Sequence, residues 1–231
     1  MTDALYPFLT SAGSGAESLS ATVARSTAEK AREIVALRRE VLTLLGPNMA
    51  ACVEALVEAF AAGGRLFVFG NGGSSTDAQD IVHTFLDPGP GAVPLPALAL
   101  TADAAVVTAL SNDIGFEVVF ARQLRAGGGP GDVAVGVSTS GGSANVLAGL
   151  AEARRMGMVT VGLAGYGGGA MAESEEVGEL DHLFAMPSSS VHRVQEVQTT
   201  LYHVLWETVQ AALSLRRPPD PGPRTPPPGR D

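Results

Sequence analysis

Two stretches decide the fold of this chain: residues 66–75, which read LFVFGNGGSS, and residues 133–143, which read VAVGVSTSGGS. Each begins as an apolar run typical of a buried strand, passes into a Gly/Ser loop, and is followed by a helical pattern. In such a unit, backbone N–H groups and hydroxyls converge near the positive end of the helix dipole, which suits a phosphate group. Neither loop holds the Lys of a nucleotide-binding P-loop. The expected ligand is therefore a small phosphorylated molecule rather than a triphosphate held with magnesium.

Strand and helix patterns alternate through the rest of the core. Besides the strands at 66–69 and 133–137, apolar runs predict strands over 97–100, 159–163 and 182–186. Helical periodicity predicts helices over 74–86, 103–110, 116–126 and 143–156. Alternation of apolar strands with helices predicts an α/β fold, in which a parallel sheet is covered on both faces.

Helices are also expected on either side of this core. Residues 17–45 carry a helical period that we expect to break at Gly46-Pro47, where a second helix begins and runs to residue 60. A last long helix is predicted over 191–215, and the proline-rich residues after it predict a disordered or polyproline-like tail. The predicted organisation is an N-terminal helical segment (1–60), a phosphate-binding α/β domain (61–215) and the tail (216–231).

The composition limits the classes of partner. The 231 residues are 45% hydrophobic and 17% charged, which is typical of a soluble α/β domain large enough to bury a core. No apolar stretch approaches the roughly 20 residues of a membrane span, so we expect a cytoplasmic protein with no membrane partner. The net charge of −9, without a Lys/Arg stripe, argues against nucleic-acid binding. The single cysteine, Cys52, excludes an intrachain disulfide and a zinc site built from cysteines.

A dinucleotide-binding loop is the first alternative to a loop that binds a small phosphorylated molecule, because Gly70-x-Gly72 follows a strand and precedes a helix. The third glycine of that fingerprint is replaced by Ser75. No acidic residue follows the second strand in a position suited to a ribose, since Asp103 is followed at once by a helical pattern. The second Ser/Thr loop would also have no role in dinucleotide binding, whereas a small phosphorylated ligand lying across both loops would use it.

The order of the motifs resembles that of the SIS (sugar isomerase) family and, within it, the phosphoheptose isomerases. The resemblance runs from about Met49 to Gln210. It rests on Gly70-Asn71-Gly72-Gly73-Ser74, Asp77-Ala78-Gln79, Asn112-Asp113-x-Gly115-Phe116, Gly131-Asp132-Val133, Ser138-Thr139-Ser140-Gly141-x-Ser143, Ala153-Arg154-x-x-Gly157-Met158 and Arg193-x-Gln195-Glu196. The resemblance implies a three-layer α/β/α sandwich with a central parallel sheet and N- and C-terminal packing helices. It also implies a homo-oligomer, expected to be a tetramer, with sites at subunit boundaries.

The resemblance also implies which residues bind the substrate. The side chains expected to hold the phosphate are Ser138, Thr139, Ser140 and Ser143. Those expected to line the sugar are Asn71, Gly72, Gly73, Ser74, Asn112 and Asp113, with Gln195 as a further substrate-binding residue.

The catalytic residues depart from the family pattern. Phosphoheptose isomerases carry a His and a Glu spaced i, i+4 on the helix after the first loop, and a Gln and a His spaced i, i+8 on the last helix; the four can bind zinc. This chain keeps the second pair as Gln195 and His203, but has Asp80 at the His position and Thr84 at the Glu position, with His83 beside it. As i, i+3 neighbours, Asp80 and His83 share roughly one helix face. We therefore expect His203, Asp80 and His83 to be catalytic, and these three with Gln195 to be the ligands of a zinc ion, if one is bound.

Each of these residues also has a structural alternative. His203 lies among apolar residues and could be a core histidine, His83 could cap the helix or contact a neighbouring subunit, and Asp80 could be a solvated helix residue. Three functions follow. The first is aldose–ketose isomerisation of sedoheptulose 7-phosphate or a related phosphosugar through an enediol. The second is a non-catalytic SIS module that presents a phosphosugar to a protein partner, and the third is other phosphosugar chemistry, such as an epimerase or a lyase.

Overall fold

The computed structural model describes residues 19–176 and 178–216. The chain separates into two compact units, residues 1–36 and 37–231. The described part of the first unit is the start of helix α1 (Leu19–Ala61), whose side chains there are mostly exposed to solvent. The predicted tail after Arg216 lies outside the described residues. The predicted segment boundaries at residues 60 and 215 stay predictions.

The second unit is built on a parallel sheet. Its five strands are β1 (Leu66–Gly70), β2 (Ala97–Ala99), β3 (Val133–Ser138), β4 (Val159–Ala164) and β5 (His182–Ala185). They lie in the order β2-β1-β3-β4-β5, and every neighbouring pair is parallel. The helices of this unit after α1 are α2 (Gly73–Leu86), α3 (Ala104–Asp113), α4 (Val119–Gly127), α5 (Ala144–Arg155), α6 (Ala170–Glu176) and α7 (Val191–Arg216). The predicted α/β sandwich is confirmed.

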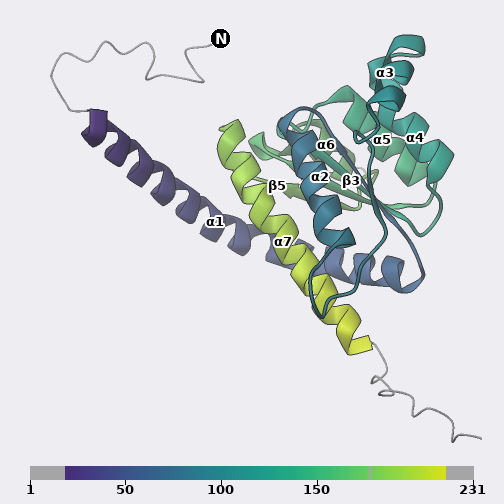
Figure 1. Cartoon of the computed structure of the whole chain (residues 1–231), viewed down its shortest axis with the longest axis horizontal. Helices are drawn as coiled ribbons and strands as arrows, with labels where there is room; N and C mark the ends of the chain where they lie inside the picture. Colours follow the sequence, from purple (N-terminus) through teal and green to yellow (C-terminus); the bar gives the residue numbers. More distant parts are fainter. Residues whose placement is uncertain (1–18, 177, 217–231) are drawn as a thin grey trace, which may run out of the picture. The chain divides into compact units, whose positions relative to one another are not determined.

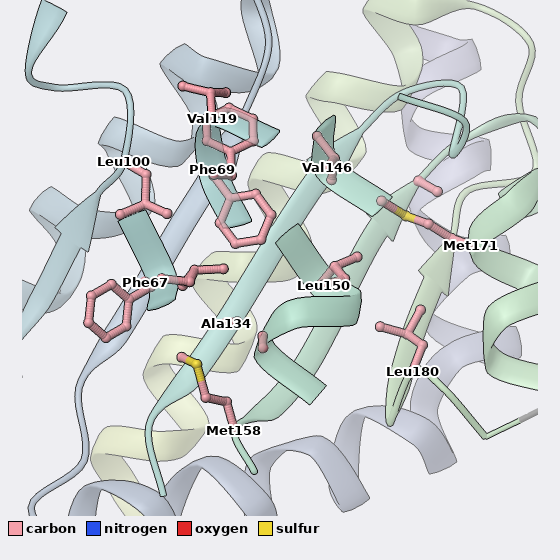
Figure 2. Close-up of a cluster of buried hydrophobic side chains, with 14 of the residues drawn as sticks. Phe67, Phe69, Leu100, Val119, Ala134, Val146, Leu150, Met158, Met171 and Leu180 are labelled. Atoms are coloured by element: carbon pink, nitrogen blue, oxygen red, sulfur yellow. The ribbon is translucent and has the colours of Figure 1, made fainter. Parts of the chain in front are cut away.

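Helices cover both faces of the sheet, with α2 and α7 on one side and α4 and α5 on the other (Figure 1). Alternation along the strands divides the core in two, because successive side chains point to opposite faces. Phe67 and Phe69 of β1 belong to the cluster that packs against α4 and α5, together with Val146 and Leu150 (Figure 2). On the opposite face, strand residues such as Leu66, Val135, Val161 and Leu163 line a small apolar cavity with side chains of α1, α2 and α7.

The predicted break at Gly46-Pro47 is wrong, because α1 continues through Pro47. A proline inside a helix removes one hydrogen bond and costs about 3 kcal/mol. Helix α1 has buried side chains on both sides of the proline, Val41 before it and Cys52, Val53 and Leu56 after it. Each of the three larger apolar side chains contributes about 1.5–3 kcal/mol on burial, so their packing outweighs the loss at the proline.

Helix α1 is also the described helix whose length and composition would allow it to cross a membrane. A core helix satisfies the same criterion, and the later part of α1 buries Cys52, Val53, Leu56, Val57 and Phe60. We therefore interpret α1 as a packing helix. The prediction that no apolar stretch approaches the length of a membrane span nevertheless does not hold for α1, which is long and apolar enough.

Candidate functional site

The two Gly/Ser loops lie side by side at the carboxyl ends of β1 and β3. These strands are neighbours, with Gly70 paired to Val137 in the register. From β1 the chain passes to β2 on one side of the sheet, whereas β3, β4 and β5 lie on the other. The strand order therefore reverses between β1 and β3, and open α/β sheets bind ligands in the crevice at such a switch point.

An amide pair joins the two loops directly. The Asn71 side chain donates to Asn145 Oδ1 at 2.8 Å, and the Asn145 side chain donates back to Asn71 Oδ1 at 2.9 Å. Asn145 is buried in the first turn of α5, so its position is fixed by packing. This reciprocal pair holds the Asn71 loop against the start of α5.

Three hydroxyls of the second loop point toward one another. Ser138 Oγ lies 2.9 Å from Ser143 Oγ and 3.4 Å from Ser140 Oγ, and Ser140 Oγ also accepts from the Gly142 N–H at 3.2 Å. Ser143 is the N-cap residue of α5, yet its side chain makes no capping hydrogen bond. The hydroxyls and the first N–H groups of α5 therefore converge on one place, which is the arrangement that a phosphate requires.

Gly141 fixes the shape of this loop. Its φ of +66° is one that L side chains rarely adopt, and a Cβ there would lie 1.8 Å from the Gly168 carbonyl oxygen. The Gly141 carbonyl accepts from the Met171 N–H at 3.1 Å, and the Thr139 carbonyl accepts from the Gly165 N–H at 2.9 Å. The loop is thus clamped against the segment that follows β4.

The first turn of α2 faces α7 through Gln195. A Cβ on Gly73 would lie 2.2 Å from Gln195 Nε2, so only glycine lets this amide approach the start of α2. The Gln195 side chain also acts on the carboxyl of Asp77, one turn further along α2, whose pKa it lowers. Oδ2 of the Asp77 carboxyl is buried and has no hydrogen-bond partner among the described residues.

Asp80, one turn beyond Asp77 on α2, also faces α7. Its Oδ2 accepts a hydrogen bond from the hydroxyl of Tyr202, a buried residue of α7. Thr84, at the family's Glu position, donates its hydroxyl to the Asp80 carbonyl at 2.8 Å, within its own helix. Helix α2 therefore still presents a carboxylate toward α7, but it belongs to Asp80, one turn before the family's Glu position at Thr84.

His203 has one ring nitrogen free for chemistry. Its Nδ1 lies 2.8 Å from the Thr199 carbonyl oxygen, which can only accept, so Nδ1 carries the proton. In the neutral imidazole, Nε2 then holds a lone pair that can accept a proton or bind a metal. The ring stacks on that of Tyr202, with centroids 4.9 Å apart. The side chain is partly buried, so it lies at the edge of the core rather than inside it.

Three predicted site residues lie elsewhere in the single chain. His83 is exposed and lines an open depression beside β2 together with Leu86 and Leu98. Asn112 and Asp113 are exposed at the end of α3, where the Asn112 amide donates to Asp113 Oδ1 at 2.9 Å. No side chain of α3 is buried. Among the described residues, no hydrogen bond links these three to the two loops.

The four predicted zinc ligands do not come together within one chain. Zinc takes about four ligands around one point. Across residues 19–176 and 178–216, no group of three or more His, Cys, Asp or Glu side chains is placed to hold a metal ion. The Asp80 carboxylate accepts from Tyr202, and His83 lies in the depression beside β2. Within one chain this donor set therefore does not fit a zinc ion, and we derive no catalytic step through one. Zinc binding by these residues stays a prediction.

Three residues near the site were not predicted as site residues: Asn145, Asp77 and Tyr202. Asn145 follows the Ser143 N-cap by two residues, and Asp77 stands in a motif that carried the family resemblance, so both had a local signal. For Tyr202 the only signal in the sequence was its polar hydroxyl in an otherwise apolar stretch of the last helix.

The carboxyl of Asp77 gives a pH-dependent prediction. Burial, and then the nearby Asp80 carboxylate, raise its pKa to about 6, against an opposing hydrogen bond from Gln195. Because the folded pKa is raised, the stability from the neutral carboxyl is complete below the unfolded value near 4 and is lost as the pH rises through 6. Asp77→Asn copies the neutral form. After a discount for solvent screening, we expect Asp77→Asn to raise the free energy of unfolding at pH 7.5 by about 1 kcal/mol, which raises Tm by about 2–4 °C.

Thermal unfolding of wild type and Asp77→Asn at pH 7.5 and 4.5 measures this difference. The gain in Tm should shrink at the lower pH. Asp113→Asn, which changes an exposed carboxylate away from α7, is the matched control and should leave Tm unchanged. An equal gain at both pH values would contradict the raised pKa.

Comparisons with known proteins agree with this geometry. A model of the SIS domain family matches residues 31–165, more than half of the chain. A phosphoheptose isomerase of Roseiflexus sp. (strain RS-1) is 42% identical over 181 residues, which cover 77% of this chain and 88% of that protein. One from Paramagnetospirillum magneticum is 45% identical over 163 residues, covering 70% and 82%. The structure of phosphoheptose isomerase GmhA from Neisseria gonorrhoeae superposes with a TM-score of 0.75 at 32% identity, covering 82% of this chain and 99% of that one.

Proposed function

Because the chain belongs to the SIS domain family and, within it, to the phosphoheptose isomerases, we propose that it interconverts an aldose phosphate and a ketose phosphate. The proposed substrate is sedoheptulose 7-phosphate. The observation that carries the proposal is the serine cluster at the carboxyl end of β3, where the Ser138, Ser140 and Ser143 hydroxyls converge on the start of α5. In this proposal the phosphate lies on these hydroxyls and the sugar extends toward the Asn71 loop.

The reaction needs no oxidant, because one proton moves between C1 and C2 through an enediol while another moves between the two oxygens. It requires a base and a group that carries the oxygen-bound proton. His203 supplies a free Nε2, and Asp80 supplies a carboxylate on the facing helix. Thr84 cannot replace either, because its hydroxyl holds its proton at neutral pH and donates it to its own helix.

A non-catalytic phosphosugar-binding module is the alternative function. It is favoured by the position of His83, which lies in the depression beside β2 instead of facing α7. It is also favoured by Thr84 at the Glu position, since loss of the base would leave the phosphate loop intact. In that case the protein would present a bound phosphosugar to a protein partner.

We also propose that the protein is cytoplasmic. We propose that it forms a homo-oligomer, and we expect a tetramer. Apolar side chains without cover in the single chain support assembly. Among the described residues these include Leu86, Leu98, Ile114 and Phe116, each 45–52% exposed. A second chain covering the depression beside β2 would also bury His83 and bring it to a subunit boundary. A monomer by light scattering at micromolar concentration would contradict the assembly.

Solvent isotope exchange separates the two functions. Wild-type protein incubated with sedoheptulose 7-phosphate in deuterated water should place deuterium at C1 or C2 and form the aldose isomer, as followed by NMR. Calorimetry in parallel measures binding of the same phosphosugar. Binding without exchange would remove the isomerase and support the binding module, whereas absence of both would remove the phosphosugar assignment.

A further inference from the structure

Tyr202 stands between the two candidate catalytic residues. It is 4% exposed and lies on the inner side of α7, where it lines the apolar cavity with Cys52, Ile81 and Phe85. Its hydroxyl nevertheless finds a charged partner, because it donates to Asp80 Oδ2 on α2. Asp80 lies on the exposed side of α2, so this hydrogen bond joins a core side chain to a surface carboxylate.

The same tyrosine contacts the imidazole of His203. The two rings are stacked with an interplanar angle of 29°. Thr199, one turn earlier on α7, links the same groups a second time. Its hydroxyl oxygen lies 3.4 Å from the Tyr202 hydroxyl, and its carbonyl accepts from His203 Nδ1. The carboxylate, the phenol and the imidazole therefore form one connected network across α2 and α7.

The network leaves the reactive atoms free. Among the described residues, Asp80 Oδ1 has no hydrogen-bond partner, and His203 keeps the Nε2 lone pair. The phenol itself is not suited to proton transfer. Burial, followed by the hydrogen bond to Asp80, raises its pKa far above neutrality. It holds its proton and acts only as a donor.

On the premise of the proposed isomerase, we propose that Tyr202 is a positioning residue that aligns the Asp80 carboxylate with the imidazole of His203. The alignment is made by hydrogen bonds and ring stacking, and it does not require a metal ion shared between α2 and α7. Two observations carry it: the Tyr202 hydroxyl reaches across to Asp80, and its ring supports His203. In the described part of the chain, no group of three or more His, Cys, Asp or Glu side chains is placed to hold a metal ion.

The test removes only the hydroxyl, with Tyr202→Phe. Loss of a hydrogen bond to a charged group lowers kcat by about 10- to 100-fold, while KM stays within about 2-fold because the phosphate loop is untouched. The Tyr202→Phe, Asp80→Asn and double variants form a cycle. If Tyr202 acts through Asp80, the double variant should be no slower than Asp80→Asn. Additive losses, or a fall in kcat matched by a rise in KM, would overturn the positioning role.

Chelation tests the metal-free arrangement. Wild-type enzyme treated with EDTA should retain its kcat and contain less than about one metal ion per ten chains by elemental analysis. Restoration of activity by added zinc after chelation would overturn this part of the proposal.

A spectroscopic readout keeps the inference separate from the activity. The protein has four histidines, so long-range ¹H–¹⁵N spectra can resolve the His203 ring after assignment with His203→Gln. The wild-type ring should show the Nδ1–H tautomer, and Tyr202→Phe should shift its resonances. If wild type turns over no phosphosugar, the proposed function fails, but this shift still decides whether Tyr202 positions His203. An unchanged His203 signal in Tyr202→Phe would overturn the inference.

Discussion

His203→Gln should lower turnover of sedoheptulose 7-phosphate by about 10²- to 10⁴-fold, the usual cost of losing a positioned acid/base group. The glutamine amide can still bond the Thr199 carbonyl, which accepts from His203 Nδ1 at 2.8 Å in the wild type. It has no lone pair basic enough to take a proton from carbon. The variant therefore keeps the contact that orients the side chain and loses the chemistry of Nε2.

His192→Gln is the matched control for this variant. His192 lies in the first turn of the same helix and is exposed, so its replacement should leave turnover unchanged. Calorimetry should give the same phosphosugar affinity for wild type and both variants, because neither histidine belongs to the serine loop. Turnover by His203→Gln within about 2-fold of wild type would show that His203 is not the acid/base group.

The strands and the loops after them could be predicted because both depend on local sequence. Runs such as Leu66 to Phe69 have the length and apolarity of buried strands, and their observed bounds differ by only a residue or two. The loops at the carboxyl ends follow from glycine and serine content. Helix α6, by contrast, is short and follows the glycines at 165–169, which break any helical period, so it was not predicted.

Features that depend on packing could not be predicted in the same way. The rule that proline breaks a helix is local, whereas the continuity of α1 past Pro47 depends on burial of Val41 and Leu56 against the core. Residues 80 and 202 are far apart in the sequence, and no sequence pattern links them. Their hydrogen bond exists because α2 and α7 pack together on one face of the sheet.

The separation of Asp80 from His83 has a geometric reason. Residues spaced i, i+3 are neighbours on a helix, but at 3.6 residues per turn they point about 60° apart. On α2 this angle spans the edge of the face that meets α7. Asp80 therefore meets Tyr202, and His83 points into the depression beside β2. Spacing alone predicts proximity, and the position of the neighbouring helix decides which side chain faces it.

Phosphosugar binding should weaken strongly when Ser138 and Ser140 are both replaced by alanine. Each hydroxyl that bonds a phosphate oxygen contributes about 1.5–3 kcal/mol, or about 10- to 100-fold in affinity. The fold should change little, because the loop shape depends on Gly141 and on backbone bonds such as Met171 N–H to the Gly141 carbonyl. Isothermal titration with sedoheptulose 7-phosphate measures the loss, and thermal unfolding checks the fold.

Ser174→Ala is the control that separates phosphate binding from a general effect of removing a hydroxyl. Ser174 Oγ donates to the Ala170 carbonyl at 3.1 Å within α6, so this change removes a partly buried hydroxyl outside the loop. The Ser174→Ala variant should bind the phosphosugar with the same affinity as wild type. Inorganic phosphate should lose affinity in the Ser138/Ser140 variant along with the phosphosugar, because the hydroxyls bind the phosphate and not the sugar. If the double variant keeps the wild-type Tm and binds the phosphosugar as tightly as wild type, the phosphate lies elsewhere, and the serine loop is only a structural turn between β3 and α5.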